Sequence, residues 1–273
     1  MSKSILELTP APIPPSLPIW PNSQRGLPNA IARSALFNTA SLRKGERDRY
    51  WQREVPTPQG TRMTYTGEEL RQDDEDVYLQ TLHLARLEGP GNEVPFIAHS
   101  MLNELGWTMN SKSYERLSDT LYRLTAATVS FTVSGPGGMR ESYTGSLLRS
   151  FMWREGADGP ALRYWRVAIE PTLATLFDPA YYSRIVWDAR MELPPLAKWL
   201  HSYYSTHTSP HPIRVATLHK LCSSDTRDLK KWRFMLRKAL ALLVESGFLL
   251  NAQVEEKSDL VVVERAAERR RLE

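Results

Sequence analysis

The 273-residue sequence predicts an α+β fold in which one pattern of elements occurs twice. In each half, a short amphipathic helix is followed by a tight polar turn, a longer helix and two candidate strands. Glycine, proline and small polar residues separate these elements, as expected where a chain reverses direction. This order is that of the winged helix, an elaborated helix-turn-helix. The sequence therefore predicts two winged-helix domains after a largely disordered, proline-rich N-terminal tail.

Residues 1–60 are predicted to form that flexible tail and an adjoining arm. Seven prolines fall between Pro10 and Pro28, which excludes a helix there and favours extended chain. A short apolar cluster and then a charged run follow. A strand or short helix from this arm could pack on the body of the protein.

The first domain is predicted at residues 61–190. Its first helix has acidic residues near the start, a basic residue near the end and Gly89 as its stop, an arrangement that suits the helix dipole. A short helix comes next, and the longer helix after it has apolar residues on one face at helical spacing. Strands are expected at residues 128–133 and 163–169.

The second domain is predicted at residues 191–265, with a charged tail at residues 266–273. A helix begins after Pro195, and a short helix with Leu218 and Leu221 follows. A long basic helix comes next and is treated separately below. The two expected strands of this domain are Phe248 to Val254 and Leu260 to Arg265.

The long helix within residues 225–250 has two faces of different character. Apolar residues gather on one side of a helical wheel, which explains how the helix docks on its domain. The opposite side is nearly all of one sign, because six basic side chains and one acid lie between Arg227 and Lys238. Arg233 lies at the boundary of the two faces. The apolar side comprises Leu229, Trp232, Leu236, Ala239, Leu240 and Leu243, and the basic side comprises Arg227, Lys230, Lys231, Arg237 and Lys238, with Phe234 among them.

The basic side of this helix indicates an anionic partner. Like charges four positions apart destabilise a helix, and a merely solvated helix usually mixes signs. A short helix and a tight turn present a recognition helix to the major groove of DNA, and Asp225 or Thr226 can cap its start. A solvated basic face is the alternative interpretation. The predicted contacts with double-stranded DNA are Thr226, Arg227, Lys230, Lys231, Phe234, Arg237 and Lys238.

The corresponding helix of the first domain carries a weaker signal. Its polar face has basic residues but also Glu115 and Asp119, so a solvated helix of mixed charge is an equally good interpretation. If this helix binds DNA, groups at its start are the best contacts, because amides and hydroxyls near a helix N-terminus bind bases or phosphates. The predicted contacts are Ser111, Lys112, Ser113, Arg116 and Arg123.

The residues that could support catalysis or metal binding do not form a recognisable site. His207 and His211 are four positions apart, but Pro210 between them disfavours a helix, and structural zinc uses tighter pairs. Tyrosine pairs occur at 181–182 and 203–204, yet the histidine pair with which DNA-nicking enzymes hold a metal is missing. There is no P-loop. We expect no enzyme activity, no cofactor and no bound metal.

Composition favours a cytoplasmic protein without a membrane segment. The single cysteine, Cys222, excludes an internal disulfide and suits a reducing compartment. No window approaches the ~18 to 20 apolar residues of a membrane span. The formal net charge of +4 permits an anionic partner without requiring one.

Three segments of the sequence resemble a known family. "LPNAIARSALF", "YTGEELRQDDEDVYLQTLHLAR" and "LYRLTAATVSFTV" are similar to segments of the TrfA-type plasmid replication initiators, and the resemblance extends from about Leu27 to Arg265. It implies two winged-helix domains that bind direct repeats, called iterons, at a plasmid origin. It also implies opening of an A·T-rich segment, recruitment of host DnaA, the replicative helicase and the sliding clamp, and a monomer–dimer equilibrium.

The resemblance also implies a clamp-binding peptide that ends in Leu-Phe. Leu36 and Phe37 match that ending, but Arg33 stands where the family prefers glutamine. Packing of this pair on the first domain is the alternative.

A transcriptional regulator built from winged helices, with no role in replication, is the alternative function. Two unlike winged helices without a ligand-binding domain favour the initiator.

Overall fold

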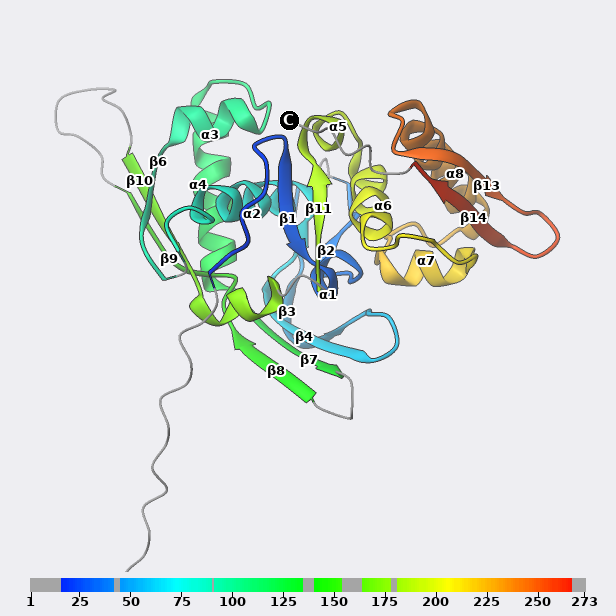
Figure 1. The fold of residues 1–273 in the computed structure, drawn as a ribbon, viewed down its shortest axis with the longest axis horizontal. Coiled ribbons are helices and arrows are strands. Elements are labelled where there is room, and N and C mark those ends of the chain that lie inside the picture. Colours follow the sequence, from blue (N-terminus) through cyan, green and yellow to red (C-terminus); the bar gives the residue numbers. More distant parts are fainter. Residues whose placement is uncertain are drawn as a thin grey trace, which may run out of the picture.

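The computed structural model describes residues 16–41, 45–89, 91–134, 140–153, 164–177 and 181–266. Helices and mostly antiparallel strands form two groups, drawn in blue to green and in yellow to red in Figure 1. Each group has its own cluster of buried apolar side chains, one running from Leu17 to Trp187 and the other from Leu193 to Val263. We call these groups the first unit and the second unit.

Helix α2 (Gln72–Ala85) is the centre of the first unit. Every residue of this helix except Leu84 is buried, including its acidic first turn. The helix starts where the backbone N–H of Arg71 donates to Asp74 Oδ2 at 2.8 Å. The strand β1 (Gln24–Pro28) and the helix α4 (Ser111–Ala126) both pack against it.

The two units repeat one order of elements. In each, a helix is followed by a short strand, a short helix and a long helix. A hairpin comes next, directly in the second unit and after two strands of another sheet in the first unit. The short strand pairs antiparallel with the last strand of the hairpin. The prediction from sequence included the helices and the hairpin of the second unit. In the first unit it included β10 (Tyr164–Ile169) but missed its hairpin partner β9 (Leu148–Trp153), and the strand expected at residues 128–133 belongs to a different sheet. It also missed the two short strands, which have only four and two residues. The first unit uses α2, β6 (Val94–Ile97), α3 (Ala98–Glu104), α4, β9 (Leu148–Trp153) and β10 (Tyr164–Ile169). The second unit uses α6 (Pro195–Ser205), β12 (Ile213–Arg214), α7 (Val215–Leu221), α8 (Leu229–Glu245), β13 (Leu249–Val254) and β14 (Leu260–Arg265).

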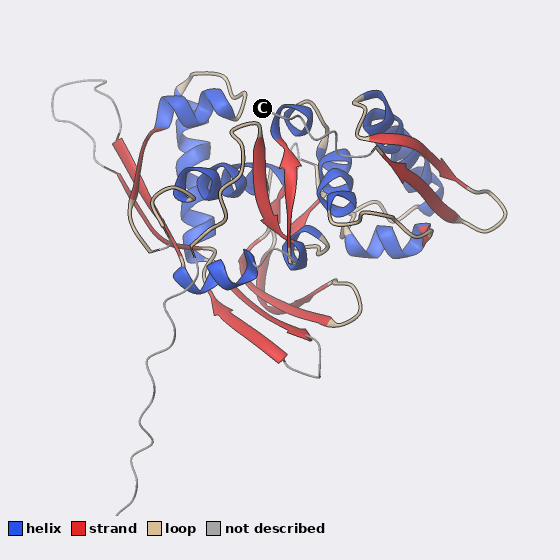
Figure 2. Cartoon of the chain, viewed as in Figure 1, coloured by secondary structure: helices blue, strands red, loops and turns tan. Residues whose placement is uncertain are grey.

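The first unit also contains a four-stranded antiparallel sheet with no counterpart among the described elements of the second unit (Figure 2). Alternation sets its two faces: Met63 and Phe131 point into the core, whereas Thr64 and Ser130 lie on the outer face and are only half-buried. The strands are β3 (Arg49–Val55), β4 (Thr61–Glu68), β7 (Thr128–Ser134) and β8 (Arg140–Gly145).

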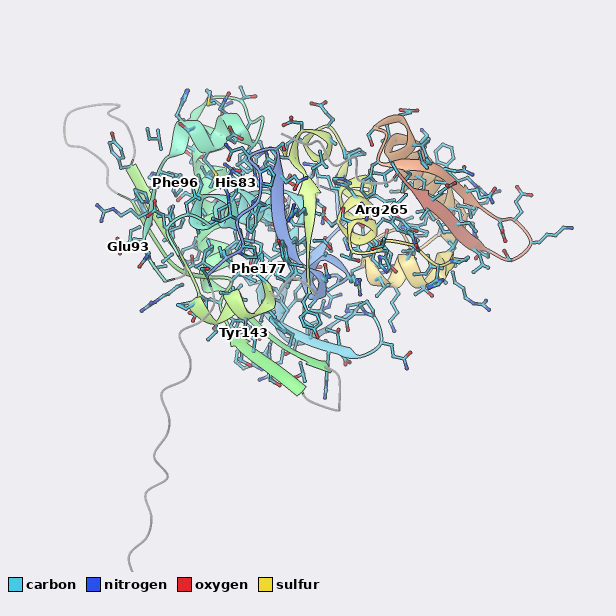
Figure 3. The ribbon with its side chains drawn as sticks, in the orientation of Figure 1. His83, Glu93, Phe96, Tyr143, Phe177 and Arg265 are labelled. Carbon is cyan, nitrogen blue, oxygen red and sulfur yellow. The ribbon has the colours of Figure 1, made fainter. Side chains whose placement is uncertain are left out.

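The segment predicted to be a flexible arm belongs to the first unit from residue 16 onward, and that prediction was wrong there. Strand β1 pairs antiparallel with β11 (Tyr182–Val186), and α1 (Asn29–Ala32) follows it. Trp20 is buried, stacks on Phe177 with ring centroids 6.1 Å apart, and donates from Nε1 to His83 Nδ1 at 3.0 Å; both partners are labelled in Figure 3. Prolines forbid a helix, but they do not prevent extended chain from pairing and burying the apolar residues between them.

The remaining short elements close the first unit. A 3-10 helix at Pro171–Phe177 and the helix α5 (Trp187–Met191) supply buried apolar side chains to its core. The strand β2 (Phe37–Asn38) pairs in parallel with β5 (Leu70–Arg71), just before α2. Residues 1–15 of the predicted tail, and all but residue 266 of the predicted C-terminal tail, lie outside the described residues.

Candidate nucleic-acid interface

Helix α8 starts later than the sequence predicted. The carboxylate of Asp228 accepts a hydrogen bond from the backbone N–H of Lys230 at 2.8 Å, so Asp228 is the cap and the helix begins at Leu229. The predicted caps, Asp225 and Thr226, lie in the turn instead. The carbonyl of Thr226 accepts from His219 Nε2 at 2.8 Å, which ties this turn to α7.

The apolar face of α8 lies against α6 and β13 in the second unit. Trp232 and Leu236 are fully buried, and the His219 ring contacts the edge or face of Trp232 with centroids 5.1 Å apart. Leu229, which the helical wheel placed on this face, is 37% exposed because it is the first residue of the helix. The helix is therefore anchored through its middle turns, and its first turn projects toward solvent.

The opposite face of α8 exposes the predicted cations. Arg227, in the turn before the helix, is exposed as well. Phe234 is 57% exposed, and Lys238 Nζ lies 4.6 Å from the centre of its ring. Within the described part of the chain, none of the five predicted cations of this face forms an ion pair. We call this set the basic face: Arg227, Lys230, Lys231, Arg237 and Lys238.

Arg233, unlike these five cations, forms an ion pair. It lies at the edge of the basic face, as the helical wheel predicted, and donates from Nε and Nη2 to the two carboxylate oxygens of Asp259 at 2.8 and 2.9 Å. Asp259 is in the turn between β13 and β14. Hydrogen bonding from Arg233 and the nearby charges of Arg237 and Arg214 lower the pKa of the Asp259 carboxyl, which is therefore ionised at neutral pH.

Helix α4 presents a different surface from α8. Asn110 caps it by accepting from Ser113 N at 3.0 Å, and Ser111 and Lys112 are exposed at its start, as predicted for contacts with a ligand. Arg116 lies 3.8 Å above the ring of Trp107 and donates to Asp73 at 2.9 Å. Its charge is therefore shared with an internal carboxylate.

Arg123 does not belong to a ligand-binding surface. Its guanidinium donates to Asp74 Oδ1 at 2.8 and 3.2 Å, and its side chain is only 10% exposed. The predicted contact of Arg123 with DNA is therefore wrong, because its charge is already neutralised inside the first unit. If Arg123 left this pair to contact DNA, the buried carboxylate of Asp74 would lose a partner for its negative charge.

The acidic first turn of α2 is a site that sequence reasoning did not find. The four consecutive acids of this turn are almost completely buried, and basic side chains surround them. Arg47 donates to Asp74 at 2.5 Å and also approaches Asp73. Burial disfavours ionisation of Asp73, but Arg47 and Arg116 outweigh burial and lower its pKa. We call Asp73, Asp74, Glu75 and Asp76 the acidic turn.

The acidic turn also joins the two units. Lys198 of α6 donates to Asp76 Oδ2 at 2.6 Å, and Ser202 of α6 donates to Glu75 at 3.0 Å. Arg190 of α5 donates to Asp76 at 2.7 Å and to Ser202 at 2.8 Å. Because Lys198 and Asp76 are 122 positions apart, no local spacing in the sequence could reveal this contact.

Further hydrogen bonds across the junction come from the segment predicted to be an arm. Arg33 donates to the side chain of Thr206 at 2.6 Å, and Trp199 Nε1 donates to the carbonyl of Ser34 at 2.9 Å. The N-terminal segment thus lies between the units and contacts both. These bonds favour a fixed orientation of α8 relative to the first unit.

The predicted clamp-binding pair is part of the core. Leu36 and Phe37 are 3% and 2% exposed, and the ring of Phe37 stacks on Tyr78 with centroids 5.8 Å apart. Phe37 also belongs to β2, whose backbone pairs with β5. The prediction that this pair binds the sliding clamp was therefore wrong, since both side chains already fill the first unit.

The described residues contain neither a metal-binding cluster nor a membrane-spanning helix. No three histidine, cysteine, aspartate or glutamate side chains there are grouped as metal ligands would be. None of the helices in those residues combines the length and apolar character that crossing a bilayer requires.

Comparison with known proteins places this architecture in a family. The sequence matches the TrfA protein family over residues 14–265. It is 32% identical over 244 residues to the plasmid replication initiator protein TrfA of Escherichia coli, covering 89% of this chain and 62% of that protein. This chain thus spans less than two thirds of that relative's length.

Two crystal structures have a similar fold. A selenomethionine derivative of domains 2 and 3 of RctB superposes with a TM-score of 0.56 at 16% identity, covering 88% of this chain and 98% of that one. A second structure of RctB domains 2-3 gives the same TM-score and identity over 87% and 97% of the two chains. At such low identity this likeness concerns the fold alone. The match over almost the whole sequence shows that this chain belongs to the TrfA family.

Proposed function

We propose that this protein is a plasmid replication initiator that binds double-stranded DNA through the basic face of α8. The observation that carries the proposal is a set of five exposed cations, four on one side of α8 and Arg227 in the turn before it, without an ion-pair partner among the described residues. The phosphates of a DNA backbone would supply the opposite charge. The relative from Escherichia coli is a plasmid replication initiator protein, which supports the role in replication.

Both units are proposed to be winged helices, the first extended by the segment that begins at residue 16. Support comes from the shared order of elements and from the short strand that completes each hairpin sheet. In such domains the long helix enters the major groove, which assigns recognition to α8 in the second unit. In the first unit, Ser111, Lys112 and Ser113 at the start of α4 remain proposed contacts, with Arg116 as a partial one.

The target is proposed to be a set of direct repeats at an origin. Two DNA-binding units held together by the acidic turn would engage one duplex in a fixed relative orientation. Opening of an adjacent A·T-rich segment, recruitment of host DnaA, helicase and clamp, and a monomer–dimer equilibrium are further parts of the proposal, supported by membership of the TrfA family. Contact with the clamp would need a surface other than Leu36 and Phe37.

The binding surface can be tested with a double variant, Lys230→Ala with Lys231→Ala. Fluorescence anisotropy would measure its affinity for a duplex carrying the direct repeats next to its gene. We expect weaker binding and a salt dependence of log K that is flatter by about 2 in slope, because two phosphate contacts are lost.

Arg49→Ala with Arg62→Ala is the matched control, because it removes the same charge from exposed positions of the four-stranded sheet. Equal losses of affinity in both double variants would contradict a specific role for α8. A plasmid-maintenance assay separates the functions: repeat binding without support of a plasmid that carries the repeats would indicate a transcriptional regulator.

A further inference from the structure

The turn between β13 and β14 is fastened to α8 by one carboxylate. Arg233 and Asp259 form a bidentate ion pair, in which both donor–acceptor distances are below 3 Å. The two side chains are 32% and 39% exposed. An ordinary surface ion pair contributes little to stability, but this planar, two-bond geometry fixes direction as well as distance.

The backbone of Asp259 makes it a junction of three elements. Its φ of +54° lies in the left-handed region, which aspartate tolerates better than most residues. Its N–H donates to the carbonyl of Glu255 across the turn at 3.0 Å, and its carbonyl accepts from the N–H of Val215 at the start of α7, also at 3.0 Å. Through Arg233 it holds α8 as well. The position of the hairpin turn therefore depends on this residue.

Asp259 places a negative charge next to the basic face of α8. Arg237 of the basic face and Arg214 of β12 are close enough to influence it, so this carboxylate lies at the edge of the surface that is proposed to face DNA. An anion there repels phosphate and also occupies Arg233, so it should weaken general attraction to DNA. The same turn carries Lys257, which is exposed and follows the exposed acids Glu255 and Glu256.

We propose that Arg233 and Asp259 are positioning residues that hold the β13–β14 turn, with Lys257, against the duplex bound by α8. Asp259 has a second effect: its ion pair with Arg233 keeps that guanidinium from binding a phosphate of the DNA. The pair thus strengthens binding to the correct site through Lys257 and weakens binding to other DNA. This inference rests on the proposed DNA-binding function.

Two variants separate these effects. Asp259→Asn keeps the size of the side chain and the backbone hydrogen bonds of residue 259. It replaces the two-bond ion pair by at most one hydrogen bond to a neutral amide oxygen, which loosens the turn and leaves the charge of Arg233 unpaired. Arg233→Gln releases the turn but frees no cation. Anisotropy would be measured with the repeat duplex and with a scrambled duplex of equal length and composition, at several potassium chloride concentrations, on the full-length protein.

For Asp259→Asn we expect a roughly tenfold fall in the ratio of repeat to scrambled affinity. Binding to scrambled DNA should strengthen, with a salt slope steeper by about 1 from the added phosphate contact. Arg233→Gln should lower the ratio without strengthening binding to scrambled DNA. Lys257→Ala should weaken repeat binding in the wild-type background and have no effect in either variant.

Thermal unfolding would check that each variant is folded. If Asp259→Asn keeps the wild-type ratio, or if Lys257→Ala acts equally in all backgrounds, the inference is overturned while the proposed function stands. A wild-type protein that prefers no repeat over scrambled DNA overturns both.

Discussion

The acidic turn of α2 and the basic face of α8 are both runs of like charge on a helix, and the structure uses them in opposite ways. The acids are buried and surrounded by guanidinium and ammonium groups from both units. The cations of the basic face are exposed and have no ion-pair partner among the described residues. A series of like charges on a helix therefore indicates a ligand of opposite charge only when the fold leaves those charges without ion-pair partners.

The two long helices α4 and α8 make the same point within equivalent positions of the two units. Arg123 of α4 forms an ion pair with Asp74, whereas Arg237 of α8 is exposed. The extra sheet and the N-terminal segment enlarge the first unit. We infer that the first unit mainly organises the molecule and that the second unit carries the stronger contact with DNA.

The largest effect should come from breaking the acidic turn with Asp76→Asn. Arg190 and Lys198 would then share less negative charge in a buried site, so we expect a loss of about 3 to 5 kcal/mol in the free energy of unfolding. Urea denaturation measures this loss. Lys231→Ala on the basic face is the control and should leave the stability unchanged. Equal stability of Asp76→Asn and the wild type would show that the acidic turn does not hold the units together.

A matched pair of substitutions sharpens the comparison of α4 with α8. Arg123→Gln should destabilise the protein by about 3 kcal/mol, because Asp74 loses a buried partner. Arg237→Gln should leave unfolding unaffected but weaken DNA binding. Denaturation and anisotropy on both variants test this opposition. A stable Arg123→Gln variant with reduced DNA affinity would reverse our assignment of this residue.

Acid should weaken the protein through the buried side of α6. Burial lowers the pKa of His201 to about 3, and the charges of Arg190 and Arg265 act in the same direction. The unfolded chain binds a proton at the ordinary pKa of about 6.5, so the stabilisation is complete above that value and falls as pH drops toward 3. At pH 5 the loss is about 2 kcal/mol.

Urea denaturation between pH 7.5 and pH 5 measures the contribution of His201. His201→Leu should flatten the dependence of stability on pH, whereas His211→Gln, at an exposed position, should not. An unchanged slope in His201→Leu would mean that this histidine takes up its proton in the folded state.

The smallest effect is expected at the start of α4. Ser111→Ala with Lys112→Ala removes two exposed groups but at most one phosphate charge, so repeat affinity should fall only about threefold. Anisotropy beside the Lys230→Ala, Lys231→Ala variant provides the ranking. If the α4 variant loses more affinity, the first unit is the principal reader of DNA.

Local spacing by itself determined much of this protein. The positions of Leu117, Leu121 and Leu124 specify the buried face of α4, and those of Trp232, Leu236 and Leu243 specify that of α8. Turn residues separated the two strands of the hairpin in the second unit, and the helical wheel placed Arg233 at the edge of the basic face. These features depend on neighbours three or four positions apart, which the sequence displays directly.

Only the tertiary structure decided which charges and apolar residues were available to a partner. Arg47 reaches Asp73 across 26 positions and Lys198 reaches Asp76 across 122, so neither pairing leaves a local pattern. Leu36 and Phe37 would look the same in sequence whether exposed or buried. Their burial follows from the pairing of β2 with β5, because free energy of burial depends on what the rest of the chain brings to a site.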